Sequence, residues 1–276
     1  MIKLLFILAG AFLFMATAGC QEEGNGDEDT MFAPKGEALQ HLKLSILYDN
    51  NPFRSGLTCD WGFSCLVETG QETILFDTGT EGKILCANMD ALGIDASSIG
   101  SVFMSHRHMD HVGGIGSFLD RNSRVHVWYL PSFAQETKDI IDSRAASAES
   151  IPEPRQLADN IYSTGQLEGR VYEQSLILRM KQGLLIITGC AHPGIVNIVE
   201  KAVELSGVSP YMVIGGFHLR SGSDEDIGAV ISRLKGLGVV KAAPTHCSGD
   251  RARALFEEAY GDNYMRVGAG WTMTVK

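Results

Sequence analysis

The segment SHRHMDH, residues 105–111, constrains this chain more than any other, because it holds three of the chain's eight histidines. Alternate residues of an extended segment point to the same side, so His106 and His108 can face one way. Asp110 and His111 follow as the chain turns into a predicted helix. Imidazole and carboxylate ligands suit zinc, and also iron, manganese or nickel. One loop of this kind can serve two metal ions about 3.5–4 Å apart.

Three later histidines each follow a predicted strand. His192 comes after the strand 184–188, His218 after 211–214 and His246 after 239–243. Open α/β folds place their sites beyond the carboxyl ends of strands. A lone histidine at a strand end is more often structural than a ligand, but four such groups together favour one shared metal pocket.

The remaining elements follow from apolar spacing, with a period of two for strands and 3.6 for helices. Strands are predicted over 41–48, 63–68, 73–76, 101–104, 125–129, 176–180, 184–188, 211–214, 239–243 and 264–267, the last closing the sheet. Helices are predicted over 82–92, 112–119, 194–205, 224–237 and 251–260. Strands followed by helices, twice over, suggest two βα halves that fold together.

The segment from about 131 to 167 differs from the rest of the chain. It is polar, lacks a strand period, and contains Pro152 and Pro154. We expect a lid-like insertion with one or two helices, and we expect it to determine the substrate.

The first residues predict export. Residues 1–19 have the short basic start and apolar run of a signal peptide, too short for a membrane-spanning helix. They end before Cys20 in a sequence that resembles the lipobox of bacterial lipoproteins, although Thr17 stands where Leu is usual. We expect Cys20 to be a lipid anchor in the cell envelope, residues 20–37 to be an acidic flexible tether, and 38–276 to be the folded domain. An ordinary signal peptide, or a short anchor with an incidental cysteine, is the alternative.

The formal net charge of −10 argues against a nucleic-acid-binding surface. Arg144, Arg155 and Arg170 lie near the insertion, but they are too few for a basic groove. They could instead bind an anionic small substrate, or be solvated surface charges.

The cysteine count does not suggest a disulfide framework. Of six cysteines, five remain without Cys20, an odd number. Cys59 and Cys65 are close enough in sequence to pair in an oxidising compartment. Buried free thiols are the alternative.

Five motifs occur in the order of a known family: Asp77-Thr78-Gly79, SHRHMDHVGGI, TGCAHPGIVNIV, VIGGFHL and PTHCSG. They resemble the metallo-β-lactamase fold superfamily. More narrowly, they resemble the branch labelled 7,8-dihydropterin-6-methyl-4-(β-D-ribofuranosyl)aminobenzene-5′-phosphate synthase-like. The resemblance runs from about residue 40 to the C-terminus. It implies an α/β fold, a four-layer αβ/βα sandwich with a metal pocket along one edge.

The resemblance also implies ligands for two divalent metal ions, zinc by preference, with iron or manganese as alternatives. The first ion would be bound by His106, His108 and His192, and the second by Asp110, His111 and His246. Asp77 would orient the ligand histidines. A plain turn-capping role is the alternative for Asp77.

Cys190 departs from the pattern of many hydrolases of this fold, which have a bridging aspartate there. A Cys190 thiolate could bind one metal ion. Alternatively, Cys190 is buried and neutral and His218 completes the site, which is the reading we prefer. The departure shifts His192 by two residues from a usual ligand position and leaves the number of metal ions open.

The expected function is a metal-dependent hydrolase that uses metal-bound hydroxide on a small ester, lactone, lactam or phosphoester. Asp110 would hold the nucleophile or accept its proton, and His218 would donate to an oxyanion or leaving group. Alternatives are an iron-dependent oxidoreductase of the same fold, the pterin-type synthase of the branch label, and a non-catalytic metal-binding lipoprotein. Export argues against the synthase, because pterin substrates belong to the cytoplasm.

Overall fold

The structure, a computed structural model, describes residues 30–32 and 36–275. The predicted signal peptide, the predicted lipid anchor at Cys20 and most of the predicted tether lie outside the described residues. Within the described part of the chain, no helix is long and apolar enough to cross a membrane.

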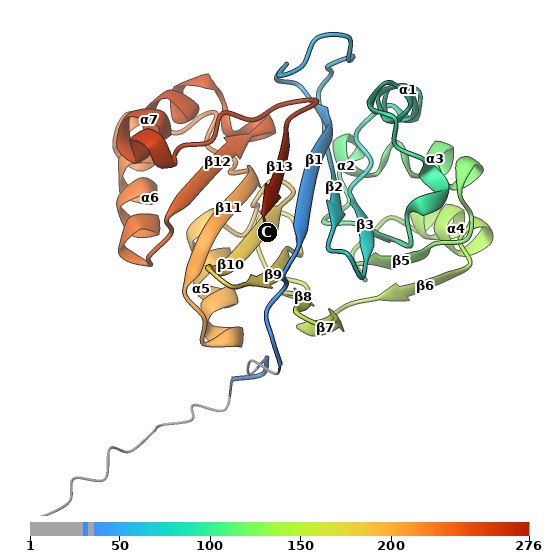
Figure 1. The fold of residues 1–276 in the computed structure, drawn as a ribbon, viewed down its shortest axis with the longest axis horizontal. Helices are drawn as coiled ribbons and strands as arrows, with labels where there is room; N and C mark the ends of the chain where they lie inside the picture. Colours follow the sequence, from blue (N-terminus) through green and yellow to red (C-terminus); the bar gives the residue numbers. More distant parts are fainter. Residues whose placement is uncertain (1–29, 33–35, 276) are drawn as a thin grey trace, which may run out of the picture.

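Two β-sheets form the centre of the fold (Figure 1). The first contains β1 (Leu42–Asp49), β2 (Phe63–Glu68), β3 (Thr73–Phe76), β4 (Ser101–Phe103), β5 (His126–Tyr129), β6 (Ser147–Ser150) and β13 (Thr272–Val275). Its strand order is β13-β1-β2-β3-β4-β5-β6. The second contains β7 (Arg155–Ala158), β8 (Ile161–Ser163), β9 (Leu176–Met180), β10 (Gly183–Thr188), β11 (Pro210–Gly216) and β12 (Lys241–Thr245). Its order is β12-β11-β10-β9-β8-β7.

Helices cover the outer face of each sheet (Figure 1). The first sheet carries α1 (Gly82–Leu92), α2 (Met109–Val112), α3 (Ile115–Arg121) and α4 (Gln135–Arg144). The second carries α5 (Ile195–Ser206), α6 (Asp224–Gly236) and α7 (Asp250–Tyr260). Short 3-10 turns occur at η1 (Ala96–Ser98), η2 (His246–Ser248) and η3 (Gly261–Asn263). The predicted four-layer αβ/βα sandwich is therefore confirmed.

The sequence of β10, GLLIIT, shows why the layers form, because every residue of this strand is buried. Leu185 and Ile187 face the core between the two sheets, whereas Leu184 and Ile186 pack under the helices of the second sheet. A strand covered on both faces is apolar throughout instead of alternating.

Parallel pairing brings strand ends together at one edge of each sheet. In the first sheet β3 is parallel to β4, and in the second β10, β11 and β12 are parallel to one another. The segments that follow these strands therefore lie at common edges, where the predicted metal-binding residues are found.

Residues 131–167, for which we expected one or two helices, contain one helix and also three short strands. After α4 the segment forms β6 at the edge of the first sheet, then β7 and β8 at the edge of the second. It carries the chain from one half of the sandwich to the other. Short edge strands such as β6 and β7 are only partly buried, so their polar residues give no apolar period.

The end of the chain also differs from the prediction. Residues 264–267 form no strand, and Tyr264 makes an isolated bridge to Ala242. The closing strand is β13, which pairs antiparallel with β1 in the first sheet. The strand predicted at 239–243 begins at Lys241, because the backbone N–H of Val239 still bonds to Leu234 at the end of α6.

All five cysteines among the described residues are free, including Cys59 and Cys65. The free-thiol alternative therefore describes this structure. Cys65, Cys190 and Cys247 are buried, whereas Cys59 and Cys86 are partly exposed.

Candidate metal centre

The segments after the strands have unusual backbone conformations. Among the described residues, five that are not glycine have positive φ, and four of these follow strands at the site: Asp77 (53°), Ala191 (60°), His218 (53°) and His246 (49°). This conformation costs about 1 kcal/mol or more for a residue with a side chain. Such strain persists only where the surroundings enforce it, and it concentrates at functional sites.

His106, His108 and His192 form the first group of potential ligands. His106 and His108 follow β4, and His192 follows β10. Their ligand atoms lie within 4.8 Å of one another. His192 Nε2 is 3.2 Å from His108 Nδ1, too crowded an arrangement for two protonated rings.

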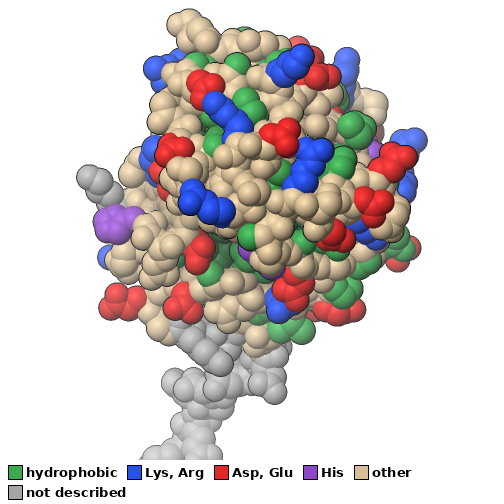
Figure 2. All heavy atoms as spheres, turned by 90° about the vertical axis from the view of Figure 1, so that its right-hand side faces the viewer, with side chains coloured by type: hydrophobic (Ala, Val, Ile, Leu, Met, Phe, Trp, Pro, Cys, Tyr) green, Lys and Arg blue, Asp and Glu red, His purple; other side chains and the backbone are tan. Residues whose placement is uncertain are grey.

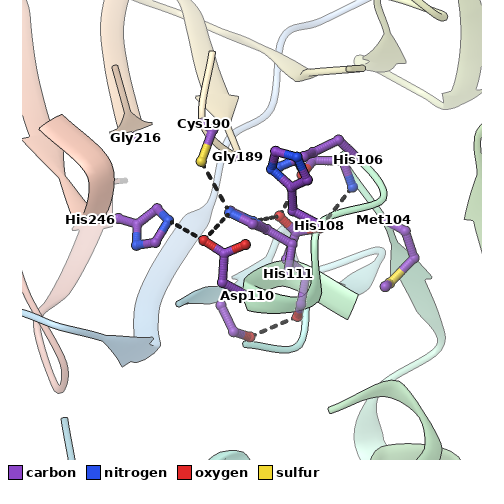
Figure 3. Close-up of polar contacts among 12 residues, drawn as sticks. Met104, His106, His108, Asp110, His111, Gly189, Cys190, Gly216 and His246 are labelled. Atoms are coloured by element: carbon purple, nitrogen blue, oxygen red, sulfur yellow. Dashed lines mark hydrogen bonds and ion pairs between the residues drawn. The ribbon is translucent and has the colours of Figure 1, made fainter. Parts of the chain in front are cut away.

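Asp110, His111, Cys190 and His246 form the second group, also within 4.8 Å of one another. Figure 3 shows these four side chains pointing toward one another from α2, the end of β10 and the end of β12. His111 Nε2 lies 3.3 Å from Cys190 Sγ and 3.7 Å from Asp110 Oδ2. His246 Nε2 lies 3.2 Å from Asp110 Oδ2.

Asp77 orients one histidine of each group, His111 directly and His106 through Ser105. Its Oδ2 accepts a hydrogen bond from His111 Nδ1 at 2.7 Å and another from Ser105 Oγ at 2.6 Å. Ser105 Oγ lies 2.9 Å from His106 Nδ1. The Nδ1 atoms are therefore occupied, and the Nε2 atoms are left for a ligand.

Asn50 and Trp61 orient two further ligands of the second group, His246 and Asp110. Asn50 Oδ1 lies 2.9 Å from His246 Nδ1, which again directs Nε2 inward. The indole Nε1 of Trp61 donates to Asp110 Oδ2 at 2.9 Å. The sequence offered no signal for either residue, because both lie in the irregular segment between β1 and β2.

The donor atoms fit divalent metal ions. His106 is fully buried, yet its Nε2 has no hydrogen-bond partner, and neither has the buried Nδ1 of His192. Burial, with the neighbouring histidines, lowers the pKa of His106 well below its usual value and that of His192 to about 3. Both imidazoles are thus neutral and have free electron pairs, as metal ligation requires.

The second group differs from the first because it contains two charged side chains, those of Asp110 and His111. Burial works to lower the pKa of His111, but the carboxylate of Asp77 outweighs it and raises the value to about 9. Burial works to raise the pKa of Asp110, yet hydrogen bonding to His246 and electrostatic attraction to His111 and His246 hold it well below its usual range. A cation bound between them would replace the proton on His111 Nε2.

Glu173 was missed by the sequence analysis, because it stands in no motif. It is fully buried, and its two carboxylate oxygens accept four backbone N–H bonds of 2.9–3.0 Å, from the run Gly189 to His192. Burial raises the pKa of Glu173 to about 7, although the N–H groups of His192 and Ala191 act to lower it. One side chain therefore fixes the loop that carries both Cys190 and His192.

Cys190 and His218, the two alternatives for completing the site, lie in different surroundings. Cys190 belongs to the second group, and it also forms a further group with His218 and Cys247. The His218 ring is tilted by 55° against the His192 ring, with the centroids 4.5 Å apart. Hydrogen bonding with Cys247, followed by burial, raises the pKa of Cys190 well above its usual value. Hydrogen bonding to Cys247 also raises the pKa of His218.

Two of the three arginines singled out in the sequence lie away from the histidines. Arg144 pairs with Asp120, and Arg155 pairs with Glu149. Figure 2 shows basic and acidic side chains intermixed over the face that contains α3 and α4. Arg170, in contrast, lines a hollow with His108, His192 and His218.

Comparison with known proteins agrees with this arrangement. Residues 58–250 match the sequence model described as "Metallo-beta-lactamase superfamily". The chain is 32% identical over 270 residues to 7,8-dihydropterin-6-methyl-4-(beta-D-ribofuranosyl)-aminobenzene-5'-phosphate synthase of Methanocaldococcus jannaschii. This alignment covers 80% of the chain and 90% of that protein. An uncharacterized protein of the same organism is 27% identical, covering 82% of this chain and 98% of that protein.

Solved structures share the fold. The structure of Tm1679, described as a metal-dependent hydrolase of the beta-lactamase superfamily, aligns with a TM-score of 0.73 at 28% identity. The alignment covers 84% of this chain and 98% of Tm1679. A diphosphatase of the PhnP family aligns with a TM-score of 0.58 at 14% identity, covering 85% of this chain and 97% of that structure.

Proposed function

Because the chain belongs to the metallo-beta-lactamase superfamily, we propose that it is a metal-dependent hydrolase of a small ester, lactone, lactam or phosphoester. The observation that carries this proposal is the pair of adjoining ligand groups, each with its donor atoms within 4.8 Å. Two sites side by side suit a displacement in which the attacking and departing oxygens are both stabilised.

His106, His108 and His192 would hold one divalent ion, and Asp110, His111, His246 and Cys190 a second. Zinc suits this mixture of nitrogen, sulfur and oxygen donors, with iron or manganese as alternatives. When bound, such an ion supplies an activated water at neutral pH and polarises the electrophilic oxygen of the substrate.

Asp110 is the residue placed to handle the nucleophile's proton. The indole of Trp61 and the ring of His246 fix its Oδ2, while hydrogen bonding to His246 and the nearby His111 keep it ionised despite its burial. His218 lies at the open side of the first group and lines two hollows there, where a substrate's leaving group or oxyanion can reach it. It is therefore the candidate proton donor.

The test is metal quantification and hydrolysis of an ester, lactone, lactam and phosphoester panel by the full-length chain. We expect about two equivalents of metal and turnover of at least one class. His106→Ala and His108→Ala should lose metal and activity together, whereas His126→Ala, on β5, should lose neither. Less than a tenth of an equivalent of metal after native purification, or activity that survives in both variants, contradicts the proposal.

A second candidate is the synthase activity named for the Methanocaldococcus jannaschii relative, because that protein is 32% identical. The two activities can be distinguished by their products. A synthase would form the aminobenzene phosphate product and would not hydrolyse the substrates of the panel. Iron in the purified protein together with oxygen consumption would instead indicate an oxidoreductase. Tight metal binding without any turnover would indicate a metal-binding lipoprotein.

We further propose that the protein is exported and lipid-anchored through Cys20. The support is the apolar run before Cys20 and the acidic residues after it. Labelling with a fatty acid probe tests this: Cys20→Ser should abolish labelling and release the protein from the membrane fraction.

A further inference from the structure

We infer that Arg107 and Arg170 form a subsite for an anionic group of the substrate, next to the first group of histidines. The inference rests on the proposed function, since it names the class of molecule that this metal centre would hydrolyse. The substrate would carry a carboxylate or phosphate remote from the bond that is cleaved.

The subsite is a hollow of about 330 Å³. It is lined by Arg107, His108, Arg170, Val171, His192 and His218. Two potential metal ligands and the candidate proton donor thus share one wall with two guanidinium groups. A substrate anion bound here places its neighbouring atoms against the histidines.

The two arginines reach this hollow for different reasons. Arg107 stands between His106 and His108 in the loop that supplies two ligands, and it lines the hollow beside His108. Arg170 is held close because the chain packs tightly against the loop of His192: a Cβ on Gly169 would lie 2.6 Å from His192 O. Glu173, three residues after Arg170, clamps the same loop.

Neither guanidinium is neutralised within the described residues. Arg107 and Arg170 are exposed and have no ion-pair partner there, whereas Arg121, Arg144 and Arg155 each pair with a carboxylate. The two guanidinium groups therefore add positive charge beside the candidate metal centre of a chain whose net charge is −10. Arginine binds carboxylate and phosphate oxygens through two parallel hydrogen bonds, which gives orientation as well as affinity.

The rest of the substrate has room along the same surface. A second hollow of about 370 Å³ shares His218 with the first and continues to Trp61 and Arg220. The guanidinium of Arg220 already lies over the Trp61 ring, 5.2 Å from its centroid. This arm offers a flat, partly apolar wall, so we assign the anion to the Arg107–Arg170 hollow.

The experiment compares two esters with the same leaving group, 4-nitrophenyl butyrate and the mono-4-nitrophenyl ester of glutaric acid, which has the same acyl chain with a terminal carboxylate added. The measured quantity is the ratio of kcat/KM for the anionic over the neutral ester, on the metal-loaded full-length protein. Arg170→Gln should lower this ratio about tenfold to a hundredfold, as expected for a lost charge-assisted hydrogen bond. Arg170→Lys should recover part of it, and Arg144→Gln should leave it unchanged.

A ratio that Arg170→Gln and Arg107→Gln both leave within twofold of the original overturns the inference. If neither ester is hydrolysed, calorimetry with inorganic phosphate tests the subsite, while the wider panel of lactones, lactams and phosphoesters tests the proposed function. The metal-loaded protein should bind phosphate, and Arg170→Gln should weaken that binding about tenfold with its metal content unchanged. No phosphate binding, or equal binding by the variant, overturns the inference independently of hydrolysis.

Discussion

Asp77 Oδ2 lies 2.7 Å from His111 Nδ1, and both side chains are completely buried. The same oxygen accepts from Ser105 Oγ, which in turn contacts His106. One carboxylate at the end of β3 therefore sets the ring orientation of a histidine in each ligand group.

Replacing Asp77 by Asn should weaken metal binding without unfolding the protein. The amide keeps the shape but removes the charge that holds His111, and loss of such an outer partner typically costs about 10- to 100-fold in metal affinity. Competition with a chromogenic chelator measures the affinity, and circular dichroism monitors the fold. Asp90→Asn, which breaks an exposed pair with Arg121, is the matched control. Unchanged affinity in Asp77→Asn would mean that Asp77 only caps a turn.

Cys190→Ser should change the second metal ion and leave the first in place. The thiol sulfur lies 3.3 Å from His111 Nε2, so a metal bound by that nitrogen can reach it. In the cobalt-substituted protein, the thiolate-to-cobalt absorption band should disappear in Cys190→Ser and persist in Cys86→Ser. A band that survives in Cys190→Ser would assign the sulfur ligand elsewhere, and Cys247 would be examined next.

His218→Ala should retain its metal ions but lose turnover. The ring lines the substrate hollows and lies outside both ligand groups, so its loss removes a proton donor, a change that costs about a hundredfold or more in kcat. Metal analysis alongside steady-state kinetics separates the two roles. Loss of metal in parallel with activity would show that His218 is a ligand after all.

Glu173→Gln should lower the free energy of unfolding by about 3 kcal/mol, because the amide accepts fewer of the four backbone N–H bonds and turns a donor toward them. Urea denaturation in the presence of a chelator measures this without a contribution from bound metal. Glu149→Gln removes an exposed ion pair with Arg155 and should cost under about 1 kcal/mol. Equal losses in the free energy of unfolding for the two substitutions would contradict the role of Glu173 in holding the loop 189–192.

The sequence predicted the elements whose residues repeat with a clear period, and the motifs that follow them. β2, β3 and α1 have the predicted bounds, and the strand-end residues Asp77, His192, His218 and His246 all reach one region. The resemblance to a known fold contributed the pairing of these residues into two groups.

Other features depend on contacts between distant residues, which no local pattern reveals. Glu173 acts through backbone N–H groups 16–19 positions away, and Trp61 reaches Asp110 from 49 positions away. Arg144, Arg155 and Arg170 look alike in the sequence, but carboxylates in the folded chain neutralise the first two. The edge strands β6 and β7 lack a period because they are short and only partly buried along their length.

The contacts of Phe32 show which end of the fold the N-terminal segment joins. Its backbone N–H bonds to Leu205 O at 2.8 Å, and its ring stacks on Tyr162, with centroids 4.6 Å apart. Leu205 lies at the far end of α5 from His192, and the 12 residues of that helix span about 18 Å. The segment before Phe32 therefore joins the folded part at the end of α5 that is remote from His192. If Cys20 anchors the chain to a membrane, the tether would join the folded part away from the histidines, which would leave them accessible to water-borne molecules.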